Sequence, residues 1–143
     1  MGEEPIYSKL ANIEIAPGDY VEGGLFTWEE ALEIEKNLSD GWRLPTRSEW
    51  ALIAEEFGQD ENGELIAEVL RKKLSLGGCY YWSSTPNNTM MYKVDQRPLP
   101  DQQYVLSLES GAHFDIKVVN TRTTISRKIG VSLRLVRDIQ RKE

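Results

Sequence analysis

The sequence predicts a single α+β domain, with helices early in the chain and a largely antiparallel sheet after them. Apolar residues recur at helical spacing between Trp28 and Leu74, and from Cys79 onward they alternate with polar residues as they do in strands. This order of helices and strands is typical of the α+β class. The length of 143 residues suits one domain, so residues 1–143 are assigned to a single unit.

Two of the helices are expected to begin at capping boxes. Thr27 lies three positions before Glu30, and Thr46 lies three positions before Glu49. In each pair the two side chains can satisfy backbone N–H groups that the first helical turn leaves open. The first helix is then expected to end at 39–41.

The second and third helices are expected to end at glycines. Gly58 is a natural C-cap for the helix that starts after Thr46. A third helix is predicted over roughly 63–74, because its apolar residues recur on one side and the glycine pair at 77–78 follows.

The strands are predicted from alternation and from turn residues. A first strand is expected over 6–15, a second at 79–84 and a short one at 90–94. Residues 104–119 resemble a hairpin, and 131–136 form the last strand. The first and last strands are expected to pair, which would bring the two ends of the chain together.

Composition narrows the classes of function. The net charge of −6 disfavours non-specific binding to nucleic acid. No run approaches the ~18 apolar residues that a membrane span needs, so no membrane insertion is expected. The acidic start of the chain lacks the apolar core of a secretory signal. We therefore expect a virion component, a surface protein exported by another route, or otherwise a cytoplasmic protein.

Three blocks of sequence carry a resemblance to a known family. They are FTWEEA at 26–31 leading to GWRLPTRSEW at 41–50, then YWSST at 81–85, then GVSLRLVRD at 130–138. Over about residues 25–138 the chain resembles the Fibrobacter succinogenes major paralogous domain and its relatives. The resemblance implies a C-type-lectin-like fold, with helices on a twisted antiparallel sheet and long loops on one edge. It also implies a scaffold for display and binding, found on bacterial surface proteins and in phage-encoded proteins.

This sequence lacks the residues on which the reactive and calcium-binding members of the wider superfamily depend. The formylglycine-generating enzymes, whose fold is distantly similar, use a cysteine pair, and this chain has only Cys79. Sulfoxide synthases use a cluster of histidines, and this chain has only His113. Calcium-dependent lectins carry a carboxylate where this chain has Thr85. We therefore expect no enzyme activity, no cofactor and no metal, with Cys79 in the core and His113 in an exposed loop.

Several distinctive side chains are expected to hold the fold. The tryptophans are interpreted as core residues, and a ligand-stacking platform is the alternative. Arg43 and Arg134 are expected to pair with carboxylates such as Glu49. The residues assigned to structure are Trp28, Trp42, Arg43, Thr46, Glu49, Trp50 and Trp82.

The two least regular stretches, 85–103 and 120–129, are the candidate ligand face. Their amide, arginine and proline residues offer adaptable hydrogen bonds at a low entropic cost, although a merely solvated loop is the alternative. The candidate ligand-binding residues are Asn87, Asn88, Tyr92, Gln96, Arg97, Asp101, Gln103, Arg122 and Thr124.

Three functional hypotheses follow. The first is a non-catalytic recognition domain that binds a protein or a glycan, on a bacterial surface protein or a phage structural component. The second is an assembly module, oligomeric or in a larger particle, without a free ligand. The third, which the residues favour least, is an enzyme of the formylglycine-generating or sulfoxide-synthase type. An exposed apolar patch would favour the second hypothesis over the first.

Overall fold

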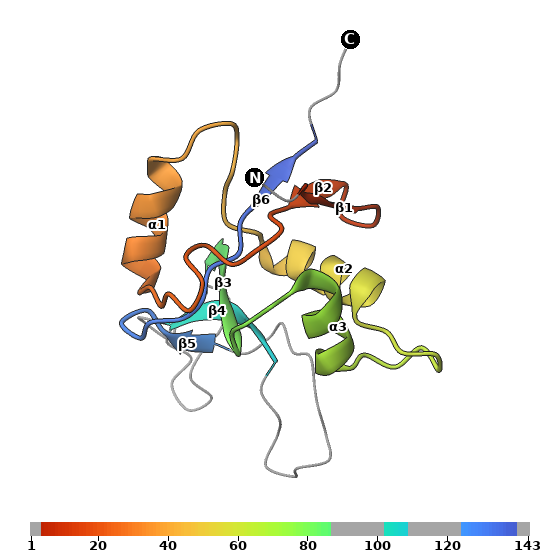
Figure 1. Cartoon of the computed structure of the whole chain (residues 1–143). Coiled ribbons are helices and arrows are strands. Elements are labelled where there is room, and N and C mark those ends of the chain that lie inside the picture. Colours follow the sequence, from red (N-terminus) through yellow and green to blue (C-terminus); the bar gives the residue numbers. More distant parts are fainter. Residues whose placement is uncertain (1–3, 87–101, 109–123, 140–143) are drawn as a thin grey trace.

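Three helices and two small antiparallel sheets make up the part of the chain that the structure, a computed structural model, describes (Figure 1). The described residues are 4–86, 102–108 and 124–139. The helices are α1 (Trp28–Lys36), α2 (Arg47–Phe57) and α3 (Ala67–Leu74). The strands are β1 (Ile6–Ser8), β2 (Ile13–Ile15), β3 (Tyr80–Pro86), β4 (Gln102–Ser107), β5 (Thr124–Ser126) and β6 (Val136–Asp138). The α+β class is therefore confirmed.

The two sheets have the strand orders β1-β2-β6 and β3-β4-β5. In the first, Ile15 is paired with Ile6 of β1 and with Val136 of β6, so the expected pairing of the two ends of the chain is present. In the second, β4 lies between the other two strands. The short strand expected at 90–94 and the second half of the hairpin expected at 104–119 lie outside the described residues.

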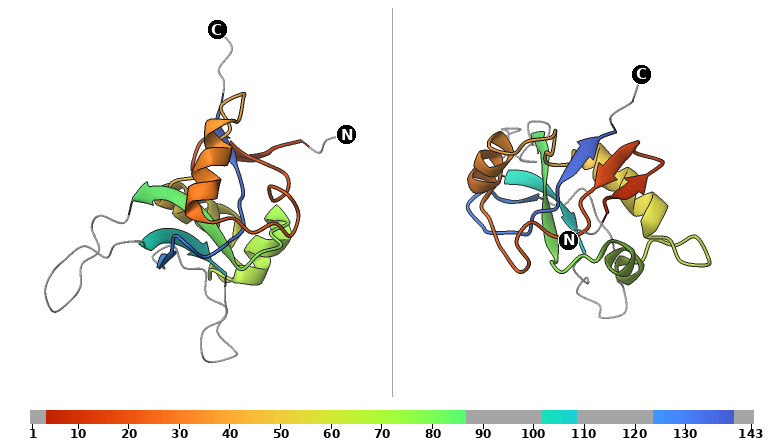
Figure 2. Two further views of the ribbon diagram at one scale, coloured as in Figure 1. Left: turned by 90° about the vertical axis from the view of Figure 1, so that its left-hand side faces the viewer. Right: turned by 45° about the horizontal axis from the view of Figure 1, so that its top comes forward.

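Both faces of the β3-β4 pair are buried. Tyr81 and Leu106 are paired across the strands and belong to a core cluster with residues of α2 and α3. Their neighbours Trp82 and Val105 face a second cluster, which lies under α1. Since successive side chains point to opposite faces of a strand, this sheet separates two cores. Figure 2 shows α1 and α2 on opposite sides of the sheet.

The prediction of one strand over 6–15 is wrong, because β1 and β2 form a hairpin there. Asn12 in the turn has a φ of 56°, a left-handed conformation that asparagine tolerates. The carboxylate of Glu56, on α2, accepts hydrogen bonds from the Ser8 hydroxyl at 2.8 Å and from the backbone N–H groups of Lys9 and Leu10 at 3.0 Å each. A side chain distant in sequence therefore holds this turn.

The two capping boxes are confirmed, and the helix ends differ in part from expectation. Both boxes are complete, and Gly58 is the C-cap of α2. Helix α1 ends at Lys36, before the predicted stop at 39–41. Helix α3 begins at Ala67, later than predicted, because residues 59–65 form a turn around the carboxylate of Asp60.

The alternation expected over 131–136 is absent, because all six residues are buried. Backbone N–H groups of residues 16–26 donate to the carbonyls of Val131, Leu133 and Leu135, at distances of 2.8–2.9 Å. The same segment forms isolated bridges to Tyr81 and to Arg43. The segment therefore runs between other backbone segments on both sides, and only 136–138 are a regular strand.

Candidate ligand-binding site

Three strand ends meet at one end of the β3-β4-β5 sheet. The register pairs Pro86 with Gln103, and Gln102 with Ser126. Because the strands are antiparallel, the end of β3, the start of β4 and the end of β5 lie together. Residues 87–101 connect the first two of these ends, so this edge of the sheet carries the main predicted ligand segment.

Arg127, directly after β5, is fixed in place at this edge. Its guanidinium lies over the ring of Trp28, 4.2 Å from the ring centroid. Its Nη2 donates to the side-chain oxygen of Gln103 at 3.2 Å, and its carbonyl accepts from the Trp28 backbone N–H at 3.1 Å. The side chain is therefore held from two directions, by a stacking contact and by a hydrogen bond.

Gln103 and Trp28 are themselves anchored on one carbonyl. The Gln103 amide donates to the carbonyl of Ser83 at 2.9 Å, and the indole N–H of Trp28 donates to the same oxygen at 3.2 Å. Gln103 is 0% exposed. Its position is set by the sheet, so Arg127 is supported by a rigid element.

The Nε atom of Arg127 is buried and has no hydrogen-bond partner among the described residues. An unpaired buried donor costs about 1–3 kcal/mol. The stacking on Trp28 and the bond to Gln103 hold the guanidinium in place although its Nε–H is left unpaired within the described part of the chain. This position therefore carries an energetic cost.

A hollow of about 370 Å³ lies beside Arg127. Its walls carry two cationic groups, one carboxylate, one hydroxyl and an indole; we call it the Arg127 hollow, lined by Thr27, Trp28, Glu29, Arg127 and Lys128. Lys128 is exposed and Arg127 is partly exposed. The Thr27 hydroxyl already accepts a hydrogen bond from the Glu30 backbone N–H in the α1 capping box, so the charged side chains of Glu29, Arg127 and Lys128 are the principal ligand-attracting groups here.

Most of the predicted ligand residues lie outside the described part of the chain. These are Asn87, Asn88, Tyr92, Gln96, Arg97, Asp101 and Arg122. Thr124 begins β5 at the opposite end of that strand from Arg127. Gln103 is buried, so its side chain supports Arg127 from within the fold.

Arg127 and Lys128 lie inside the predicted range 120–129, but the sequence did not single them out. The available signal in the sequence was two adjacent cationic residues within this range. The importance of these two residues depends on the contact of Arg127 with Trp28. Because Trp28 lies far away in the sequence, local patterns could not reveal this contact.

The four tryptophans divide into two pairs. Trp50 and Trp82 are 1% and 0% exposed, and the indole N–H of Trp50 donates to the Trp82 carbonyl at 3.1 Å. Trp28 and Trp42 are half-buried, and each lies under an arginine, Arg127 or Arg137. The first pair fills the interior, while the second pair positions arginines at the surface.

The expected pairing of Arg43 with Glu49 is present. Two guanidinium nitrogens donate to the two carboxylate oxygens at 2.8 and 2.7 Å, and Asp138 accepts from Arg43 at 2.7 Å. Burial favours the neutral form of Glu49, but the hydrogen bonds from Arg43 and from the Thr46 N–H outweigh it and lower the pKa of Glu49.

We expect this arrangement to make stability acid-sensitive. The pKa values of Glu49 and Glu56 are lower in the folded chain, so as the pH falls below about 4.5 the unfolded chain takes up protons first. The contribution of these two carboxylates to the free energy of unfolding should therefore be present above this pH and decline below it. Urea unfolding between pH 7 and pH 3 measures the decline, and Glu49→Gln should reduce it. An equal decline in wild type and variant would contradict the assignment.

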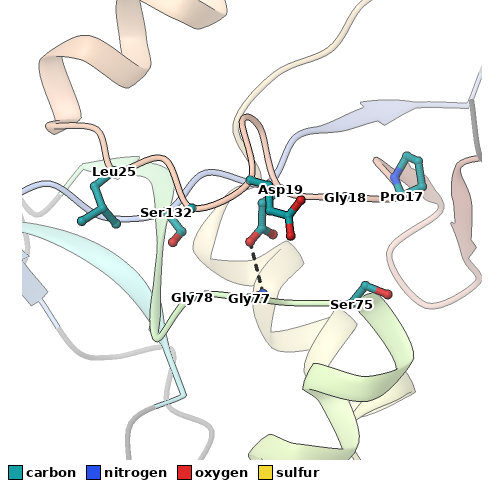
Figure 3. Close-up of a pocket in the computed structure, with 10 residues that line it drawn as sticks. Pro17, Gly18, Asp19, Leu25, Ser75, Gly77, Gly78 and Ser132 are labelled. Carbon is teal, nitrogen blue, oxygen red and sulfur yellow. Dashed lines mark hydrogen bonds between the residues drawn. The ribbon is translucent and has the colours of Figure 1, made fainter.

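A second hollow, of about 810 Å³, lies between the 17–25 segment and the 75–78 segment (Figure 3). We call it the Asp19 hollow; the residues that line it include Pro17, Asp19, Glu22, Leu25, Gly77 and Gly78. Both oxygens of Asp19 are engaged, by Arg134, by the Tyr81 hydroxyl and by the backbone N–H of Gly77. The carboxylate therefore serves the fold and does not await a ligand.

Arg134 is the buried partner in this network. It is 0% exposed, and its Nη2 lies 2.8 Å from Asp19 Oδ1. Its other donors reach the carbonyls of Ala16, Leu74 and Ser75 at 2.6–2.9 Å. Burial raises the pKa of the Tyr81 hydroxyl, which stays a neutral donor to Asp19. The expectation that Arg134 pairs with a carboxylate is thus confirmed.

Gly78, at the edge of the Asp19 hollow, should not tolerate a side chain. A Cβ there would collide with the hydroxyl and Cβ of Ser132, which is 5% exposed. We expect Gly78→Ala to lower the free energy of unfolding by about 1–3 kcal/mol in urea titrations. Gly18→Ala, where a Cβ would have no neighbour within 4 Å, is the matched control. Equal effects of the two substitutions would refute the steric explanation.

The prediction that Cys79 lies in the core is wrong, because its side chain is exposed. It precedes β3, whose apolar run begins one residue later, at Tyr80. His113 lies outside the described residues.

In the described ranges no group of three or more His, Cys, Asp and Glu side chains is arranged to hold a metal ion. Within the same ranges, each helix is too short or too polar to cross a bilayer. A scan against protein families and a search of curated proteins found no match to this chain.

Proposed function

We propose that the chain is a non-catalytic recognition domain whose ligand contacts the Arg127 hollow and the adjoining strand ends. One observation carries this proposal: Arg127 is held on Trp28 and Gln103, at the rim of an open hollow and at an energetic cost. A side chain fixed in advance loses little entropy on binding, which increases affinity. The hollow also has the size of small-molecule and sugar subsites.

The position of the hollow supports the same proposal. It lies at the edge of the sheet where 87–101 joins β3 to β4, so the candidate residues Asn87 and Arg97 belong to a segment anchored at this edge. Loops carried by a rigid sheet are a common location for binding residues. We therefore include 85–103 and 120–129 in the proposed ligand face.

A C-type-lectin-like fold remains our proposal for the finer class. What supports it is that the blocks of the family resemblance meet through backbone bridges. Phe26 bridges to Val131, Tyr81 to Ser132, and Arg43 to Val136. These blocks behave as a common framework, as a family scaffold would. A bacterial surface protein or a phage structural component is the setting we propose with it.

A glycan array and a pull-down of candidate surface proteins test the recognition role. We expect Lys128→Ala, Arg127→Ala and Arg97→Ala to weaken capture of a ligand that wild type retains. Lys36→Ala is the matched control, since Lys36 is exposed at the far end of α1. Capture that is equal in all four variants would refute the proposed face.

An assembly module is the second candidate, and one observation favours it. Val21, Leu25 and Ile129 are 60%, 65% and 53% exposed. A Cβ on Gly130 would lie 3.1 Å from that of Leu25, so Leu25 and Ile129 belong to adjacent segments. Under this alternative, a second copy of the chain covers these side chains. Light scattering of wild type and Leu25→Glu tests this alternative, which predicts that wild type self-associates and the variant does not. A wild type that stays monomeric at high concentration removes it.

A further inference from the structure

We infer that the Arg127 hollow takes a carboxylate-bearing sugar residue of an acidic glycan, an inference that rests on the proposed function. The hollow is lined by the cationic side chains of Arg127 and Lys128 and by the carboxylate of Glu29. A ligand that satisfies all three must carry both a negative group and hydrogen-bond donors. A uronic or sialic acid residue has one carboxylate and several hydroxyls, which matches this combination.

The cations determine where the carboxylate lies. A guanidinium has five N–H donors; Gln103 accepts one of those of Arg127 and the Nε–H is buried, so at most three remain for a ligand. Lys128 is adjacent in the sequence, exposed, and lines the same hollow, so two positive groups can share one carboxylate. Charge-assisted hydrogen bonds of this kind are about twice as strong as neutral ones.

Glu29 distinguishes a sugar from an acidic peptide. An ionised carboxylate only accepts hydrogen bonds, so it attracts sugar hydroxyls and repels further carboxylates. An Asp- or Glu-rich segment has backbone N–H donors but places a carboxylate on nearly every residue, so its further carboxylates would meet this repulsion. The hollow of about 370 Å³ also has room for one sugar ring. The observations therefore favour the glycan.

The net charge of −6 does not prevent this binding. At an ionic strength of 0.15 M, exposed charges are screened beyond about 8 Å, so the groups in the hollow dominate the local potential. The same screening predicts that affinity falls as salt is added. The lining of the hollow needs no calcium ion to attract the carboxylate, and chelation should leave binding unchanged.

Calorimetric titration with trigalacturonate and 3′-sialyllactose, each beside its carboxyl-reduced counterpart, tests the inference. We expect at least one acidic probe to bind about tenfold or more tightly than its reduced form. Lys128→Gln should remove most of this difference. Lys36→Gln, at the end of α1 remote from the hollow, should retain it. Because Lys128 is exposed, this substitution should leave the fold intact, which circular dichroism verifies.

Glu29→Gln provides the decisive comparison with a peptide ligand. It should weaken binding of 3′-sialyllactose, which has one carboxylate and whose hydroxyls would donate to Glu29, whereas it would strengthen binding of hexaglutamate by removing repulsion. Two results would overturn the inference: no preference for either acidic probe over its reduced form, or hexaglutamate binding more tightly than both sugars. If a neutral glycan or a protein still binds and Arg127→Ala abolishes its binding, only the carboxylate inference fails. If every ligand found binds equally to all variants, the proposed function fails as well.

Discussion

Replacing Asp19 by alanine is expected to lower the free energy of unfolding by about 3–5 kcal/mol. Arg134 is completely buried, and Asp19 is the carboxylate that neutralises it, at 2.8 Å. Removal of that carboxylate leaves a guanidinium charge in the interior with only carbonyl partners. The Tyr81 hydroxyl and the Gly77 N–H lose their acceptor at the same time. Urea unfolding of the variant measures the loss.

The partly exposed pair of Glu14 and Arg137 serves as the control. These side chains are 3.0 Å apart and are 29% and 25% exposed, so Glu14→Gln should cost less than about 1 kcal/mol. The double variant Asp19→Ala, Arg134→Met should recover part of the loss, because it leaves no unpaired charge. A cost for Asp19→Ala no greater than that for Glu14→Gln would refute the role of the pair.

The second large effect is expected at Trp50, where substitution by alanine should cost about 3–5 kcal/mol. The indole is 1% exposed, its ring centroid lies 5.8 Å from that of Tyr81, and its N–H donates to the Trp82 carbonyl. The substitution leaves both a cavity and an unpaired buried carbonyl. Thermal and urea unfolding report the change.

Trp42→Ala is the matched comparison, since Trp42 is half-buried beneath Arg137 and lies nearer the surface. We expect a smaller loss there than for Trp50→Ala. Equal losses in the free energy of unfolding would contradict the expectation that the buried Trp50 contributes more to stability than the half-buried Trp42.

Features that depend on local sequence were predicted correctly. The two capping boxes and the glycine at the end of α2 each involve residues within one turn, so they can be recognised from the sequence alone. The partner of Arg43 lies only six positions away, at Glu49. The helical half of the fold is encoded largely by such short-range patterns.

Features that depend on distant partners were not predictable. The break between β1 and β2 is held by Glu56, far along the chain on α2. The burial of 131–136 follows from backbone contacts with segments on both sides, which hide its alternation. The Arg127 hollow likewise needs Trp28 and Gln103 to be brought together by folding. Patterns within one sequence do not show which residues distant in the chain will come into contact.

Because the Arg127 hollow draws its walls from the start of α1 and from the turn after β5, the unfolded chain has no counterpart of it. A ligand that occupies it therefore binds only the native state, and by mass action it must raise the melting temperature in proportion to the logarithm of its concentration once it exceeds Kd. A ligand should also make the native chain more resistant to proteolysis. The stability of the fold can therefore be used to screen candidate ligands of this domain.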